Sequence, residues 1–126
     1  MTTPGLGLAL VAAFALGTGI SGFLEGIQSL DEPPNSLAIV VAVANLMMGA
    51  GGIATAVMVW RKDRRALVPF LIWGGSAVLA SVAAPRAYSP EVGWPPVLIG
   101  GITTALLLAL IFAYVRRRLA ITARDA

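Results

Sequence analysis

Long apolar segments alternate with short polar ones along the whole chain. The runs without a charged side chain span residues 5–24, 37–60, 66–84 and 97–115. Each is close to the roughly 20 residues that a helix needs to cross about 30 Å of hydrocarbon. Backbone polar groups find no water there, so each run must satisfy them internally as a helix. The pattern predicts an all-α polytopic membrane protein, an antiparallel bundle of four transmembrane helices at about residues 5–28, 37–60, 66–84 and 96–116.

The length leaves room for one domain. Four spans and their loops account for nearly all of the 126 residues, so we expect a single transmembrane domain over residues 1–126. A signal peptide needs a basic segment ahead of its apolar run, and residues 1–4 contain no basic residue. We therefore expect the first run to be retained as a helix.

The basic residues gather on one side of this pattern. Of the nine Lys and Arg residues, all but Arg86 lie between runs two and three or after run four, at positions 61, 62, 64, 65, 116, 117, 118 and 124. Lys and Arg near helix ends resist translocation, so the basic segments are expected to stay in the cytoplasm. Both termini are then cytoplasmic, in a multi-pass protein of the cell (inner, cytoplasmic) membrane.

Composition narrows the possible chemistry. Cysteine and histidine are both absent, which removes disulfides, thiolate metal sites and imidazole ligands. The serines have no histidine to activate them. The adjacent carboxylates Asp31 and Glu32 lack a second pair with which to build an acid–base site. These absences lead us to expect no enzyme activity, no cofactor and no metal. We also expect no nucleic-acid partner, because the basic residues set the membrane topology and lie beside anionic lipid headgroups.

Small residues line one face of the second expected helix. At about 100° per residue, one stripe collects Ala38, Ala42, Asn45, Gly49, Gly52 and Ala56. Small side chains let helix backbones approach closely, and an asparagine can hydrogen-bond across the contact. The stripe predicts a packing seam that faces the bundle interior. The alternative is an unwound segment at residues 49–52 beside Asn45, of the kind that forms solute sites in transporters.

The first expected helix carries a related stripe of Ala15, Thr18, Gly22, Glu25 and Gly26. The spacing of Gly22 and Gly26 matches the G-x-x-x-G packing motif. Because Glu25 shares this face, we expect it to point at a neighbouring helix, within reach of Arg86, Asn45 or water. An ionisable residue within a span is a functional candidate. Glu25 is therefore either structural, near the outer interface, or coupled to proton or cation movement.

The third expected helix adds a packing residue and a boundary. Gly74 is expected at a helix contact, and Trp73 at a packing or lipid surface. Pro85 is expected in the second outer loop, because proline is poorly tolerated inside a helix.

A longer segment, residues 49–73, combines a Gly-rich helix end, Val59-Trp60-Arg61, a short basic turn and an apolar run bearing Trp73. This layout resembles that of small bacterial four-helix membrane proteins, including DoxX-like ones. The resemblance covers topology and carries no family-specific motif, so it assigns no site residue. The small multidrug-resistance transporters also have a glutamate in helix one, but here Glu25 lies near the end of its run and the charge bias is strong.

Two classes of function are compatible with these features. The first is a non-enzymatic accessory, packing or assembly subunit, in contact with the lipid bilayer and with other membrane subunits or itself. The second is a homo-oligomeric carrier of a small solute or ion. In the carrier, Glu25 and Asn45, with Arg86 nearby, form an intramembrane polar site. The helix-packing candidates in either case are Gly22, Gly26, Gly49, Gly52 and Gly74.

The topology is open to a labelling test, since any introduced cysteine is unique in a chain without cysteine. Cysteines at Ser29 and Ser89 are expected to react with an impermeant maleimide in intact cells. One at Thr122 is expected to react only after permeabilisation. Labelling of the Thr122 site in intact cells would contradict the proposed topology.

Overall fold

The chain folds into four long helices. The structure, a computed structural model, describes residues 5–89 and 91–125. Its elements are α1 (Leu6–Ser29), α2 (Ser36–Trp60), the short 3-10 helix η1 (Arg64–Ala66), α3 (Leu67–Tyr88) and α4 (Trp94–Asp125). All four α-helices are long and apolar enough to cross a membrane. The described residues form no strand, so the expected all-α class with four candidate spans is confirmed.

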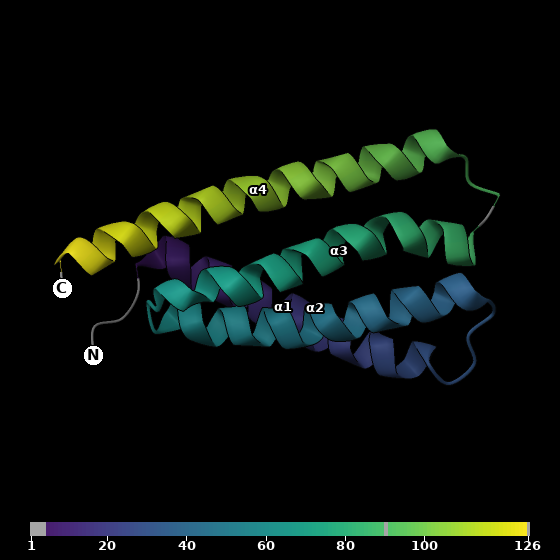
Figure 1. The fold of residues 1–126 in the computed structure, drawn as a ribbon, viewed down its shortest axis with the longest axis horizontal. Helices are drawn as coiled ribbons and strands as arrows, with labels where there is room; N and C mark the ends of the chain where they lie inside the picture. Colours follow the sequence, from purple (N-terminus) through teal and green to yellow (C-terminus); the bar gives the residue numbers. More distant parts are fainter. Residues whose placement is uncertain (1–4, 90, 126) are drawn as a thin grey trace.

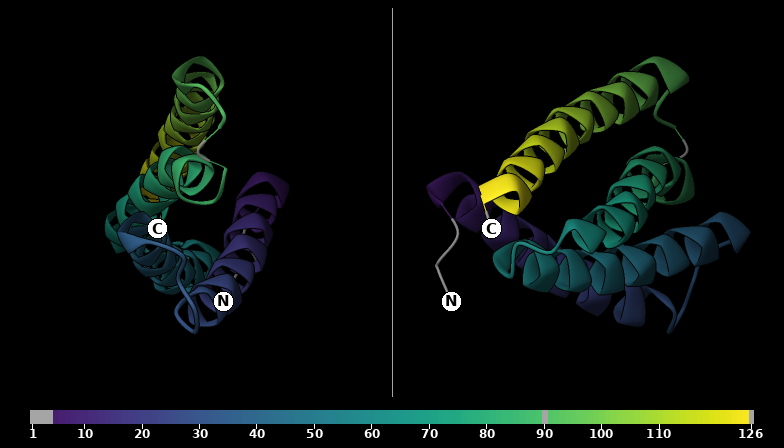
Figure 2. Two further views of the ribbon diagram at one scale, coloured as in Figure 1. Left: turned by 90° about the vertical axis from the view of Figure 1, so that its right-hand side faces the viewer. Right: turned by 60° about the vertical axis from the view of Figure 1, so that its left-hand side comes forward.

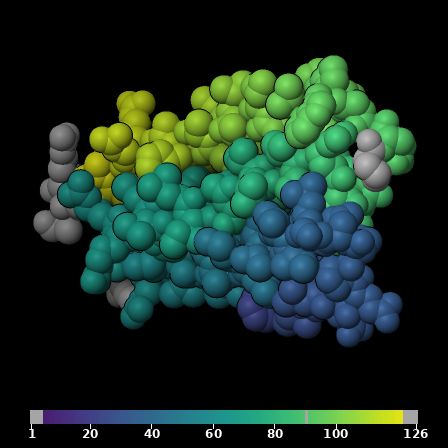
Figure 3. Space-filling view, turned by 45° about the vertical axis from the view of Figure 1, so that its right-hand side comes forward, coloured from purple at the N-terminus to yellow at the C-terminus, as the bar shows by residue number. Residues whose placement is uncertain are grey.

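Successive helices run in opposite directions and lie beside one another in chain order (Figure 1). The start of α1, the turn between α2 and α3, and the end of α4 lie at the same end of the molecule, which we call the basic end. The α1–α2 and α3–α4 loops lie at the other end. Helices α1, α2 and α3 pack closely, whereas α4 is the most exposed span and lies mainly over α3 (Figures 2 and 3).

Two helix ends differ from the sequence-based expectation. Helix α3 continues through Pro85 to Tyr88, so the placement of Pro85 in the outer loop is wrong. Proline removes one backbone donor and crowds the carbonyl four residues earlier. Close to the end of a span this carbonyl can reach water, which keeps the cost small. Helix α4 extends to Asp125, past the expected end at residue 116, because arginine and alanine are good helix formers outside the membrane too.

The backbones of α1 and α2 approach each other closely, mostly through residues with small side chains. The expected stripe on α2 is buried throughout. The facing residues, which we call the α1–α2 seam, are Ala15, Gly19, Gly22 and Gly26 on α1 and Ala42, Asn45, Gly49 and Gly52 on α2. Both sets alternate steps of three and four residues. This 3.5-residue period is the one that keeps two helices in contact along a single seam.

Backbone atoms meet almost directly across the seam. A Cβ atom added to Gly52 would lie 2.7 Å from the Ala15 carbonyl oxygen. One added to Gly26 would lie 2.9 Å from the Ala42 carbonyl oxygen. Neither helix has room for a side chain at these points, so the approach depends on glycine.

The opposite side of α2 approaches α3 in a similar way. A Cβ atom on Gly51 would lie 2.8 Å from the Trp73 backbone nitrogen and 3.1 Å from the Pro69 carbonyl oxygen. Helix α2 thus lies between two close neighbours. It is one continuous helix through residues 49–52, so the unwound segment considered above is not found.

The turn at the basic end has a defined backbone. The Asp63 N–H donates to the Met58 carbonyl at 2.9 Å, and the Lys62 N–H donates to the Val59 carbonyl at 3.0 Å. These two bonds form a Schellman motif, which places Lys62 in the left-handed region at a φ of 58°. The Asp63 carboxylate then accepts from the Arg65 N–H at 2.9 Å. That bond is the main cause that lowers the pKa of Asp63, and the hydrogen bond from the Arg65 side chain is the second.

Asn35 organises the opposite end. Its side-chain oxygen accepts from the Ala38 N–H at 2.9 Å and so caps the start of α2. Its side-chain nitrogen donates to the Ala87 carbonyl, also at 2.9 Å. One residue therefore fixes the start of α2 to the last turn of α3.

The α1–α2 seam predicts opposite effects for the same substitution at two glycines. Gly52→Ala is expected to destabilise the protein by about 1–3 kcal/mol, because its Cβ meets α1 backbone atoms that cannot move aside. Gly17→Ala is the control, since an added Cβ there has no atom within 4 Å. It is expected to be neutral or stabilising, because alanine favours helix over glycine by about 1 kcal/mol. Thermal unfolding in one detergent measures both, and wild-type stability of Gly52→Ala would contradict the seam.

Candidate functional site

Glu25 lies on α1 near the end opposite the basic end, and its side chain is exposed. The next residue, Gly26, is buried in the α1–α2 seam. The expectation that Glu25 points at a neighbouring helix is therefore wrong. A contact between backbones has no space for a carboxylate, and an exposed position near the helix end lets water or headgroups solvate its charge.

Asn45 occupies the middle of the seam. It is 8% exposed, and its backbone carbonyl oxygen lies 3.1 Å from where a Cβ on Gly22 would be. Its side-chain amide makes no hydrogen bond to another described residue. In the described chain no fully buried side-chain nitrogen or oxygen lacks a partner. The amide of Asn45 therefore keeps some access to the surface of the helix pair.

Arg86 lies in the last turn of α3 and faces the start of α4. Its guanidinium donates to the Val92 carbonyl at 3.0 Å and sits 4.6 Å from the centre of the Trp94 ring. These contacts fasten the α3–α4 loop, and a cation over an indole face adds a favourable electrostatic term.

The three residues proposed as one polar site thus have separate surroundings. Glu25 is exposed on α1, Asn45 is buried where α2 meets α1, and Arg86 is engaged with the α3–α4 loop. No hydrogen bond or ion pair connects any two of them in the described structure. The three side chains therefore do not form one polar binding site in this structure.

One partly buried polar contact between distant residues is not predicted by the sequence pattern. The Trp73 indole N–H donates to Thr18 Oγ1 at 3.1 Å, and Trp73 is 1% exposed. Its ring also makes edge-to-face contacts with Phe14 and Phe70, and Phe70 makes another with Phe112. A buried indole N–H needs an acceptor. A tryptophan expected in a packed position therefore predicts that some Ser or Thr accepts its N–H. The sequence does not say which of several Ser and Thr residues supplies the oxygen.

Apolar grooves open between helices in the part of the chain that the structure describes, and two of them have a defined lining. The α1–α2 groove, with a volume of about 390 Å³, is lined by Ala9, Ala12, Ala13, Leu16, Ala56, Val57, Trp60 and Arg61. The α3–α4 groove, of about 280 Å³, is lined by Phe70, Leu71, Gly74, Gly75, Val78, Ala105, Leu108, Ala109 and Phe112. Among the described residues no three His, Cys, Asp or Glu side chains cluster to hold a metal ion. The grooves are suited to apolar groups.

Comparison of the chain with protein-family models, curated proteins and solved structures finds no match. The resemblance in layout to DoxX-like proteins therefore stays a prediction.

The exposed position of Glu25 predicts a mild substitution. Glu25→Gln keeps the shape of the side chain and removes a charge that no described partner neutralises, so the free energy of unfolding is expected to change by less than about 0.5 kcal/mol. Glu32→Gln, in the neighbouring loop, is the matched control for loss of one exposed carboxylate. Both are measured by thermal unfolding in detergent. Proton-linked flux in proteoliposomes that Glu25→Gln alone abolishes would instead assign Glu25 a coupling role.

Proposed function

We propose that this chain is a non-enzymatic accessory or assembly subunit of the cytoplasmic membrane, with both termini in the cytoplasm. The orientation is supported by the basic end, where Arg61, Arg64 and Arg65 in one turn meet the arginine-rich end of α4. Two separate basic segments at one end of the molecule agree in sign, which is the pattern that retains loops in the cytoplasm. The lack of His and Cys leaves few groups for catalysis.

The observation that carries the assembly role is the α3–α4 groove. Helix α4 is mostly unburied. It packs through a narrow stripe that includes Val97 and Leu108, and the apolar α3–α4 groove opens beside this stripe. Small residues from both helices line this groove, among them Gly75, Ala105 and Ala109. Small residues on an open face allow a further transmembrane helix to approach closely, which is how helices associate in lipid.

Gly75 marks the open part of this surface. A Cβ atom added there has nothing within 4 Å, whereas one on Gly74 would touch Leu108 and Phe70 at 3.8 Å. Gly74 therefore serves the contact between α3 and α4, and Gly75 is available to a helix from another subunit or a second copy. A carrier is less well supported, because the grooves are apolar and Glu25 and Asn45 do not meet.

The proposal predicts that filling the groove removes the partner and leaves the fold intact. Gly75→Leu is expected to weaken the binding of a co-purifying subunit by about fivefold to 150-fold, which corresponds to the 1–3 kcal/mol cost of overfilling a packed contact. Gly17→Leu places the same side chain on an equally open face of α1 and is expected to keep the partner. Purification in mild detergent, with the stoichiometry of bound subunits as readout, measures both.

Three outcomes would contradict this assignment. A monomeric wild-type chain in native-source membranes would remove the assembly role. Equal partner recovery from Gly75→Leu and Gly17→Leu would move the contact away from the α3–α4 groove. A homo-oligomer whose thermal stability rises with one added solute would favour the carrier.

A further inference from the structure

We propose that the α1–α2 groove binds an acyl chain of an anionic phospholipid, with the Arg61 guanidinium at the phosphate of that lipid. This inference goes beyond the assembly role and does not depend on it, since the two grooves lie on different helix pairs. It rests on the shape of the groove, its apolar walls and the single cation at its rim.

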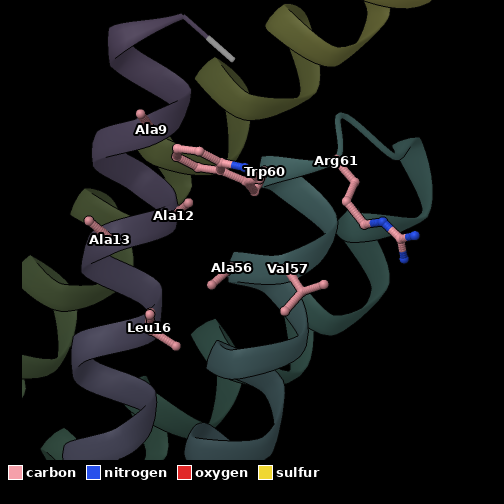
Figure 4. A pocket seen from close by; sticks show the side chains of 8 residues that line it. All are labelled: Ala9, Ala12, Ala13, Leu16, Ala56, Val57, Trp60 and Arg61. Carbon is pink, nitrogen blue, oxygen red and sulfur yellow. The ribbon is translucent and has the colours of Figure 1, made fainter. Parts of the chain in front are cut away.

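The groove follows from the small residues on both helices. Ala9, Ala12 and Ala13 on α1 and Ala56 on α2 are too short to fill the flank of the helix pair. The resulting space of about 390 Å³ is within the usual range of ligand pockets, roughly 300–1,000 Å³. Figure 4 shows these side chains along the groove, with Leu16 at the end farther from Trp60. An apolar, flexible chain is the group that such walls accept.

Trp60 sets the depth of the groove in the membrane. It is the last residue of α2, about half exposed, and its ring extends across the groove toward α1 (Figure 4). Tryptophan favours the level of the headgroups. An acyl chain that lies along Leu16 and Val57 therefore has its headgroup near Trp60, at the basic end.

Arg61 supplies the charge complement. It lines the groove, is exposed, and follows Trp60 directly. In Figure 4 its side chain extends on the side of α2 that faces away from α1, from where the long, exposed side chain can turn to a phosphate beside Trp60. Arg65 of the same turn is paired with Asp63 at 3.3 Å. Arg61 forms no hydrogen bond or ion pair with a described residue, and its charge contributes only as the last of the causes that lower the pKa of Asp63. A guanidinium matches the oxygens of a phosphate with two parallel donors, and a net negative headgroup is favoured beside it over a zwitterionic one.

Native mass spectrometry of the purified full-length chain tests the headgroup preference. The chain is equilibrated in detergent with equal amounts of a phosphatidylglycerol and a phosphatidylcholine that carry the same acyl chains. We expect about fivefold more retained phosphatidylglycerol, the factor that corresponds to about 1 kcal/mol for one basic residue near the surface. Arg61→Gln is expected to abolish the preference. Arg64→Gln, which removes an exposed arginine of the same turn that does not line the groove, is expected to keep it.

A second pair of variants tests the groove itself. Ala13→Leu fills it from α1 and Val57→Phe fills it from α2, each at an exposed position. Both are expected to lower the retention of either lipid while thermal unfolding stays cooperative, and either variant suffices if the other does not fold. Equal retention of the two lipids by the wild type would overturn the proposal. So would equal loss of preference in Arg61→Gln and Arg64→Gln, or unchanged retention in a folded groove-filling variant.

Discussion

Close approach of the α1 and α2 backbones is the contact on which the rest of the structure depends. Within hydrocarbon, apolar side chains gain little by leaving lipid for protein, so helices associate chiefly through van der Waals contact at short range. The chain achieves that range by placing glycine where the backbones meet, as at Gly26 and Gly52. Gly51 extends the same device to α3, and the indole of Trp73 then fastens α3 to Thr18 of α1. Three helices are thereby held as one unit.

The small side chains that allow close packing also leave grooves on the surface. Alanines beside the α1–α2 seam leave a groove because they cannot cover the flank of the pair. Helix α4 lacks a comparable glycine seam with α3: Gly101 meets Val82, and Gly100 has open space around it. It packs through a narrow stripe that includes Val97, Leu108 and Val115, and much of the rest of its surface is exposed. Tight packing in one half of the fold and open grooves beside it have one origin in residue size.

The sequence allowed the spans and the buried stripe of α2 to be predicted, because hydropathy and the helical repeat act locally. The same repeat led to a wrong placement of Glu25. A wide stripe on α1 contains Glu25 as well as the buried Gly26, and only the position of α2 decides which of the two faces the helix contact. Pro85 was placed in the loop because proline locally disfavours a helix. The solvated end of the span nevertheless tolerates proline within α3. Bonds between distant residues, such as Trp73 to Thr18 and Asn35 to Ala87, leave no local pattern.

The length of α4 has a mechanical consequence. Its 32 residues correspond to about 48 Å at 1.5 Å per residue, well beyond the roughly 30 Å of a hydrocarbon core. The arginines at residues 116–118 therefore stand on the same rigid rod as the lining of the α3–α4 groove, rather than on a separate tail. A rotation or tilt of α4 at the groove would be carried along the helix axis to these charges. Movement of α4, the least buried span of the fold, would therefore displace these charges at the membrane face.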